Sequence, residues 1–225
     1  MLSAIAIVPS APVLVPELAG RAAPADLSAA VLAAAALLPP RWIVAGTGRA
    51  DDVLGPDCEG TFAGFGVDVR VGLSPQEAEL AELPLCALIG AWVRGQARPD
   101  ASAQARVYRE DHDADVARAL GRQLRAELDQ SSDPIGVLVV ADGANTLTPT
   151  APGGYEPGNA EAQQTLDDAL ASGDSAALTR LPGQILGRVA FQVLAGLTEP
   201  GPRTAKELYR GAPYGVGYFA GVWQP

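Results

Sequence analysis

Histidine and cysteine are scarce in this sequence of 225 residues. It has one histidine, His112, and two cysteines, Cys58 and Cys86. A single histidine excludes any mechanism in which one chain supplies two imidazoles. The two cysteines are far apart in the sequence, and in a reducing compartment we expect each to be a small hydrophobic residue without chemistry of its own.

Positive charge is also scarce. Sixteen lysines and arginines face 26 aspartates and glutamates, which gives a formal net charge of −10, and the basic residues are spread along the chain. Nucleic acids and anionic membranes need a positive surface, so we expect neither as a partner. Hydrophobic residues make up 48% of the chain and charged residues 19%, a composition typical of a globular protein.

Long apolar segments are missing as well. The first eight residues are apolar, but no basic residues precede them and Pro9 ends the run. They predict a buried strand, since a signal peptide needs a basic start and a longer apolar region. No apolar stretch of 18 or more residues is free of charge and proline, so no membrane-spanning helix is predicted. We expect a cytoplasmic protein and leave its oligomeric state open.

Strand and helix patterns alternate along the chain. This alternation predicts a single α/β domain over residues 1–225, with a largely parallel or mixed central sheet and helices on both faces. Strands are predicted at 3–8, 41–46, 67–72, 135–141 and 215–223. Helices are predicted at 26–38, 76–97 with a break at Pro84, 113–129, 159–171, 184–197 and 203–210.

Ligands of open α/β sheets bind at the carboxyl ends of the strands. The loop after the strand at 135–141 is rich in hydrogen-bonding side chains there, with Asp142, Asn145, Thr146 and Thr148. These residues indicate either a ligand site or a turn whose side chains satisfy nearby backbone donors, and the sequence favours neither. Tyr155, further on, could close one wall of such a site.

Two other polar segments have more ordinary interpretations. Gly46-Thr47-Gly48 follows a predicted strand as in dinucleotide-binding motifs, but Asp51 stands where a third glycine is needed. The acidic residues around His112 could ligate a hard cation, but they also suit the start of a helix, which we favour. The neighbouring acids suit a hydrogen-bonding or ligand-orienting role for His112, and a structural role is favoured over a catalytic one.

Several segments together resemble the superfamily of class III extradiol ring-cleavage dioxygenases and their Memo-like relatives, over nearly the full length. They are Pro9-Ser-Ala-Pro-Val-Leu-Val-Pro-Glu17, Asp111-His-Asp-Ala-Asp-Val116 and Pro213-Tyr-Gly-Val-Gly-Tyr218. The most specific match is Asp142-Gly-Ala-Asn-Thr-Leu-Thr-Pro149, followed by Ala-Pro-Gly-Gly-Tyr155. The resemblance implies an α/β core with its site at the strand ends.

The departures from this family bear on function. Its active members hold Fe(II) with two histidines and a carboxylate and use a further histidine as acid and base. Ser10 stands here at the first ligand position, Gly46-Thr47-Gly48 where Pro-His is expected, and Asn145-Thr146 where Ser-His is expected. Hydroxyl groups are poor Fe(II) ligands, and one histidine cannot complete the set. His112 alone matches a family histidine.

The resemblance and the residues together predict a ligand pocket without a metal or other cofactor. Its residues are Ser10, Thr47, His112, Asp142, Asn145, Thr146 and Tyr155, with His112 as the single candidate catalytic residue. We expect a non-catalytic, metal-free homologue that binds a small polar molecule or a partner protein. The alternative is an active metal-dependent dioxygenase or other oxidoreductase with an atypical ligand set.

Overall fold

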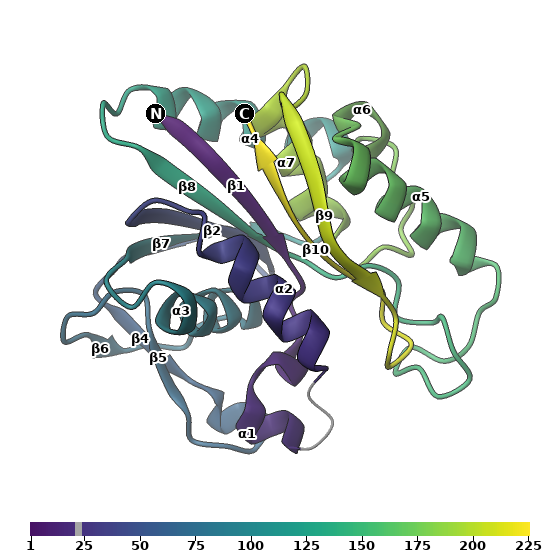
Figure 1. The fold of residues 1–225 in the computed structure, drawn as a ribbon, viewed down its shortest axis with the longest axis horizontal. Helices are drawn as coiled ribbons and strands as arrows, with labels where there is room; N and C mark the ends of the chain where they lie inside the picture. Colours follow the sequence, from purple (N-terminus) through teal and green to yellow (C-terminus); the bar gives the residue numbers. More distant parts are fainter. Residues whose placement is uncertain (21–23) are drawn as a thin grey trace.

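A seven-stranded mixed sheet forms the centre of the molecule (Figure 1). The computed structural model describes residues 1–20 and 24–225. The strand order is β3-β7-β2-β8-β1-β10-β9. Four adjacent strands run parallel to one another: β7 (Ser102–Arg109), β2 (Arg41–Gly48), β8 (Ile135–Val140) and β1 (Leu2–Val8). The carboxyl ends of these four strands therefore share one edge of the sheet.

Antiparallel strands complete both sides of the sheet. β3 (Asp52–Leu54) pairs with β7 at one side, and β10 (Tyr218–Gln224) pairs with β1 at the other. β9 (Thr204–Gly211) forms the edge beyond β10. The chain thus begins and ends on neighbouring strands, and Figure 1 shows the two termini close together.

Helices cover both faces of the sheet, as predicted. α2 (Ala25–Ala35) and α3 (Leu85–Ala97) pack on one face. α4 (Ala114–Asp129), α5 (Asn159–Ser172) and α7 (Arg188–Thr198) pack on the other. The fold class is therefore confirmed as a single α/β domain (Figure 1).

The two cores follow from alternation along the strands. In β1, Ala4, Ala6 and Val8 belong to the core under α2 and α3, whereas Ile5 and Ile7 belong to the core under α4, α5 and α7. Successive side chains of a strand point to opposite faces, so an apolar strand contributes to both cores.

Short elements fill the connections. A second sheet of order β5-β4-β6 lies beyond α3. It consists of β4 (Cys58–Thr61), β5 (Arg70–Gly72) and β6 (Glu79–Leu80). Other short elements among the described residues are η1 (Pro12–Leu14), α1 (Pro16–Ala19), η3 (Phe62–Phe65) and α6 (Ser175–Leu178). Among the described residues no helix is both long and apolar enough to cross a membrane.

Several details of the sequence-based prediction were wrong, and the short strands β3, β4 and β6 were not predicted. Residues 203–210, predicted as a helix, form the edge strand β9, because pairing with β10 outweighs their helix propensity. The strand β7 was not predicted. The helix predicted at 76–97 begins only at Leu85, because Pro84 has the extended backbone of an N-cap residue.

Candidate functional site

Asp142 and Ser10 meet where the sheet changes its direction of winding. β1 leads to α2 on one face, and the neighbouring parallel strand β8 leads to α5 on the other. In open α/β sheets, ligands bind at such a point, in the crevice at the carboxyl ends of the strands. The backbone N–H of Ser10 donates a hydrogen bond of 2.8 Å to Oδ1 of Asp142. Within the described chain this is the one hydrogen bond to the Asp142 carboxyl, so its second oxygen is left for another donor.

The Asp142 carboxyl lies in an unfavourable place for a charge. Burial raises its pKa to about 7, and the hydrogen bond from Ser10 lowers the pKa only in part. No cation of the described chain contributes to this balance. A carboxyl that is removed from water without a positive partner costs folding free energy, and such groups cluster at functional sites.

Tyr218 is held beside this carboxyl by its neighbour Gly217. The Gly217 N–H donates to the carbonyl of Ala144, and the Gly217 carbonyl accepts from Gly143 N–H, both at 2.8 Å. The Tyr218 side chain is 5% exposed, and its hydroxyl has no hydrogen-bond partner among the described residues. Burial raises the pKa of the phenol, and the negative charge of Asp142 raises it further.

The side chain of Gln163, from α5, holds the loop after β8 in place. Its Oε1 accepts from Ala144 N–H at 2.8 Å, and its Nε2 donates to Oδ1 of Asp167 at 2.9 Å. A Cβ atom at Gly143 or Gly217 would collide with the Gln163 amide, so both glycines are required for this close approach. Burial raises the pKa of Asp167 to about 6. Gln163 could not be found from the sequence, because only the packing of α5 brings it here.

The rest of the loop after β8 is organised by its own side chains. The Asn145 amide packs against Gly153, and the Asn145 carbonyl accepts from Gly153 N–H at 3.0 Å. Thr146 Oγ1 accepts a 2.8 Å hydrogen bond from the side chain of Asn159. The Tyr155 side chain is 54% exposed. These contacts favour the turn-forming role for Asn145 and Thr146.

His112 and Asp51 form a second polar pair on the same edge of the sheet. They follow β7 and β2, which are neighbouring parallel strands. His112 Nε2 lies 2.8 and 2.9 Å from the two carboxyl oxygens of Asp51, and Arg109 N–H donates to Asp51 at 2.8 Å. Partial burial raises the pKa of Asp51, but these hydrogen bonds outweigh it and hold the pKa below its usual value. Asp51 was not predicted as the partner of His112.

Thr47 lines an open cleft of about 740 Å³ between the ends of β2 and β7 and the start of α3. Arg49, Glu82 and Glu110 bring charges of both signs to its walls, and Phe65 adds an aromatic ring. Of the seven predicted pocket residues, Thr47 is the one that lines this cleft. The structure thus joins Ser10 with Asp142 and His112 with Asp51, whereas contact of all seven with one ligand stays a prediction.

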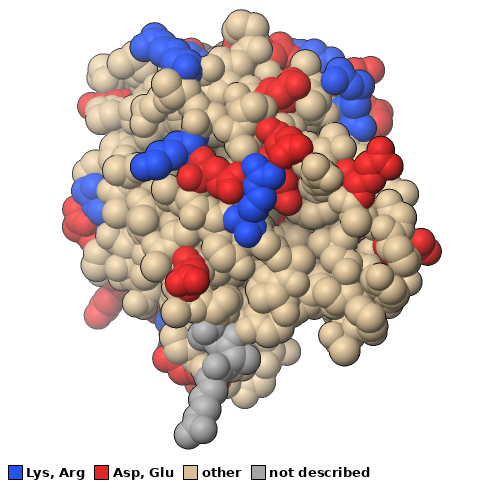
Figure 2. Space-filling view, turned by 45° about the vertical axis from the view of Figure 1, so that its right-hand side comes forward, with Lys and Arg blue, Asp and Glu red and all other residues tan. Residues whose placement is uncertain are grey.

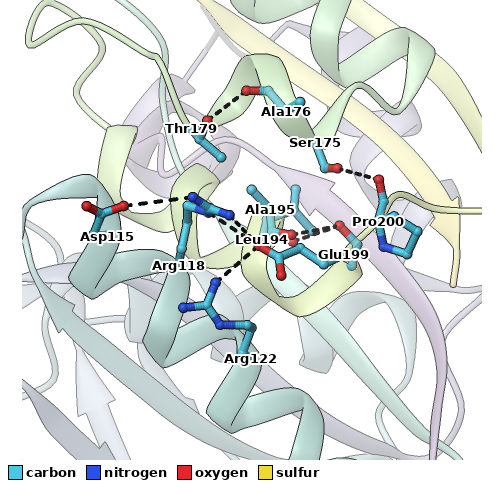
Figure 3. Close-up of polar contacts among 11 residues, drawn as sticks. Asp115, Arg118, Arg122, Ser175, Ala176, Thr179, Leu194, Ala195, Glu199 and Pro200 are labelled. Carbon is cyan, nitrogen blue, oxygen red and sulfur yellow. Dashed lines mark hydrogen bonds and ion pairs between the residues drawn. The ribbon is translucent and has the colours of Figure 1, made fainter.

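Another hollow, of about 410 Å³, lies between α4, α6 and the end of α7 (Figure 3). Arg118 and Arg122 both donate to Oε1 of Glu199, at distances of 2.9 to 3.3 Å. The hydrogen bonds from Arg118 in particular hold the pKa of Glu199 below its usual value. The two guanidinium groups are therefore matched by a carboxylate of the same chain.

Charges of opposite sign also lie side by side on the face shown in Figure 2, with larger uncharged areas between them. Among the ion pairs of the described chain, Arg210 contacts Asp168 at 2.8 Å and Glu207 at 2.5 Å. This face shows no broad positive area of the kind that nucleic acids require.

Comparisons with known proteins place the chain in a fold class and go no further. Its fold resembles the crystal structure of the uncharacterized protein JW3007 from Escherichia coli K12, with a TM-score of 0.61 and 12% sequence identity over 98% of this chain and 99% of that one. This likeness shows a common α/β fold alone. No family model and no curated protein matches the sequence. The resemblance to the extradiol dioxygenase superfamily therefore stays a prediction.

Proposed function

We propose that this protein binds a small polar molecule at the strand-end site around Ser10 and Asp142, as a metal-free and non-catalytic homologue of the extradiol dioxygenases. One observation carries the proposal. The Asp142 carboxyl lies at the point where β1 and β8 diverge, with one hydrogen bond and no cation among its described neighbours. A ligand that donates a hydrogen bond to its second oxygen would compensate the buried carboxyl. A half-buried site of this kind suits a small molecule better than a partner protein.

The residues present do not fit the Fe(II) centre of that superfamily. Ser10, Thr47 and Thr146 offer hydroxyl groups at the positions of the expected histidines, and Nε2 of His112 already contacts Asp51. Within residues 1–20 and 24–225, no three side chains of His, Cys, Asp or Glu are grouped so as to hold a metal ion. We therefore derive no reaction step through iron and rank the metal-dependent enzyme second. The proposed setting is the cytoplasm, where Cys58 and Cys86 would remain free thiols, as they are in the structure.

A ligand screen by thermal unfolding tests the binding proposal. A ligand that binds the native state at 100 times its Kd stabilises it by about 2.7 kcal/mol, which a melting curve detects. We expect at least one small polar metabolite to raise the Tm of the wild type but not that of Asp142→Asn. The matched control is Asp57→Asn, at an exposed carboxyl without an ion pair among the described residues, and it should respond like the wild type. Equal stabilisation of all three proteins would count against the site.

An oxygen electrode tests the absence of ring-cleavage activity. The protein is loaded anaerobically with Fe(II) and mixed with catechols such as protocatechuate. We expect no oxygen uptake above the rate of free Fe(II), because the chain lacks the two-histidine ligand set. Turnover that a chelator abolishes would favour the enzyme instead.

A further inference from the structure

Two tyrosines from neighbouring strands gather at the Asp142 site. Tyr218, at the start of β10, pairs with Gly211 at the end of β9. A Cβ atom on Gly211 would lie 2.7 Å from the hydroxyl oxygen of Tyr209, so the Tyr209 hydroxyl lies next to the residue that pairs with Tyr218. Both side chains belong to the face of the sheet that α2 covers.

Asp142 points toward the same face. Val140, two residues earlier, lies in the core under α2 together with Val8 and Tyr218. Alternation along a strand places Asp142 and Ser10 on this side, since each follows a core residue of that side by two positions. The Asp142 carboxyl and the phenols of Tyr218 and Tyr209 thus lie at the same end of the sheet face that α2 covers.

Negative charge surrounds these phenols. Burial and then the charge of Asp142 raise the pKa of Tyr218, and Tyr214 and Tyr209 contribute further. Burial and then the charge of Asp26, at the start of α2, raise the pKa of Tyr209. Among the described residues no lysine or arginine adds a compensating charge to Asp142, Tyr209 or Tyr218. Tyr218 and Tyr209 therefore each lie near a carboxyl group, and no cation of the described residues balances these two charges.

We propose that the ligand of this site is a small organic cation, an amine or a quaternary ammonium ion, held by the Asp142 carboxylate and the ring faces of Tyr218 and its neighbouring tyrosines. A cation would supply the positive charge that no described residue provides to the buried carboxylate. Aromatic rings attract such ions through their negative faces, most strongly where water is excluded. The hydroxyl of Tyr218, which has no partner among the described residues, could accept a hydrogen bond from an N–H of an amine. This inference rests on the proposed function and deepens it.

The probe is tetramethylammonium chloride, followed by two-dimensional amide NMR at pH 8. Its charge is independent of pH, and tert-butanol provides a neutral molecule of similar size. We expect saturable shifts of the Ser10, Gly143 and Gly217 amides with tetramethylammonium and at least ten-fold weaker binding of tert-butanol. Sodium chloride at the same concentration controls for ionic strength.

Variants separate the contributions of charge and ring. Asp142→Asn should weaken tetramethylammonium binding at least ten-fold. Tyr218→Phe keeps the ring and should change the affinity less than two-fold, whereas Tyr218→Leu should weaken binding about five-fold. Should Tyr218→Leu fail to fold, Tyr214→Leu at the more exposed ring takes its place, with a smaller loss expected. The Asp57→Asn control should bind like the wild type.

Lower pH gives an independent readout. Binding should weaken as the pH falls from 8 to 6, because Asp142 takes up a proton. Around it, Ser10 N–H donates to the carboxyl, and its charge acts on Tyr218 of β10; Tyr214 and Tyr209 act in turn on Tyr218, and Asp26 of α2 acts on Tyr209. Tyr218 and Tyr209 stay neutral in this range, since burial and negative charge raise the pKa of both phenols above its ordinary value near 10.

The outcomes distinguish this inference from the proposed function. Equal binding of tert-butanol, or unchanged affinity of Asp142→Asn, would overturn the inference. If tetramethylammonium does not bind but a neutral or anionic metabolite stabilises the wild type and not Asp142→Asn, the inference fails and the proposed function stands. If no compound discriminates between these two proteins, both fail.

Discussion

Asparagine at position 142 should stabilise the free protein, and the gain should depend on pH. The Asp142 carboxyl has a pKa of about 7 in the folded protein against an ordinary value of 3.8. The folded state therefore binds the proton more tightly than the unfolded chain does. As the pH rises from 4 to 7, the unfolded chain loses this proton first, and the stability of the wild type falls. At a pH well above 7 the carboxyl is deprotonated in both states, so the stability of the wild type falls no further from this group.

The size of the effect follows from that difference. The two pKa values lie about 3 pH units apart, and each unit corresponds to about 1.4 kcal/mol, which gives about 4 kcal/mol at most. Asparagine has nearly the same shape, carries no charge, and its Oδ1 can still accept the hydrogen bond from Ser10 N–H. The gain in unfolding free energy should thus grow from near zero at pH 4 to about 2 to 4 kcal/mol at pH 8.5.

Urea unfolding of the wild type and Asp142→Asn, at half-unit steps from pH 4 to 8.5, measures this gain. Asp167 also has a raised pKa, of about 6, but it is present in both proteins and cancels in the difference. The exposed Asp57→Asn variant should show no gain at any pH. A gain that is the same at pH 4 and 8.5, or a loss at pH 8.5, would refute the reasoning.

The remaining predictions concern the scaffold, and each is checked by urea unfolding at pH 7. Gln163→Met keeps the side-chain volume but leaves Ala144 N–H and the Asp167 carboxyl without their partner, so it should lower the unfolding free energy by about 2 to 3 kcal/mol. A decrease below about 0.5 kcal/mol would show that water replaces the Gln163 amide. Gly121→Ala places a Cβ atom against the Val193 carbonyl, where α4 crosses α7, and should lower the unfolding free energy by about 3 kcal/mol. Gly95→Ala in α3, where the space is open, should raise the unfolding free energy by about 0.5 to 1 kcal/mol, and equal effects of the two variants would contradict the packing argument. Asp113→Ala removes the N-cap of α4, whose carboxylate accepts from Val116 N–H at 2.8 Å, and should cost about 1 kcal/mol, with Asp113→Ser retaining most of the stability.

The sequence predicted the elements whose signals are local and strong. The uncharged apolar run over β8 and the start of α4 among the acidic residues around His112 lie where they were predicted. β7 escaped prediction because its inward positions are mostly alanines, Ala103 and Ala105, which are small and favour no strand. β9 was misassigned because Ala, Lys, Glu and Leu are good helix formers, and only its pairing with β10 makes it a strand.

For the candidate site, the sequence revealed single residues but not their partners. Asp142 could be found because it follows a buried strand. Asp51 lies 61 positions before His112, and the backbone of Gly217 and the Gln163 side chain reach the Asp142 loop only through packing of β10 and α5. Such long-range contacts depend on the strand order, which the sequence patterns leave open.

The most direct test of the Asp142 site is a ¹³C NMR titration of the Asp142 carboxyl carbon in the free protein. The signal is assigned by its absence from Asp142→Asn. Because this carboxyl lies at the end of β8, largely removed from water and without a cation among its described neighbours, we predict a midpoint near pH 7. A midpoint below pH 5 would show a solvated or charge-compensated carboxylate, and would contradict the stability penalty and the binding site that are built on it.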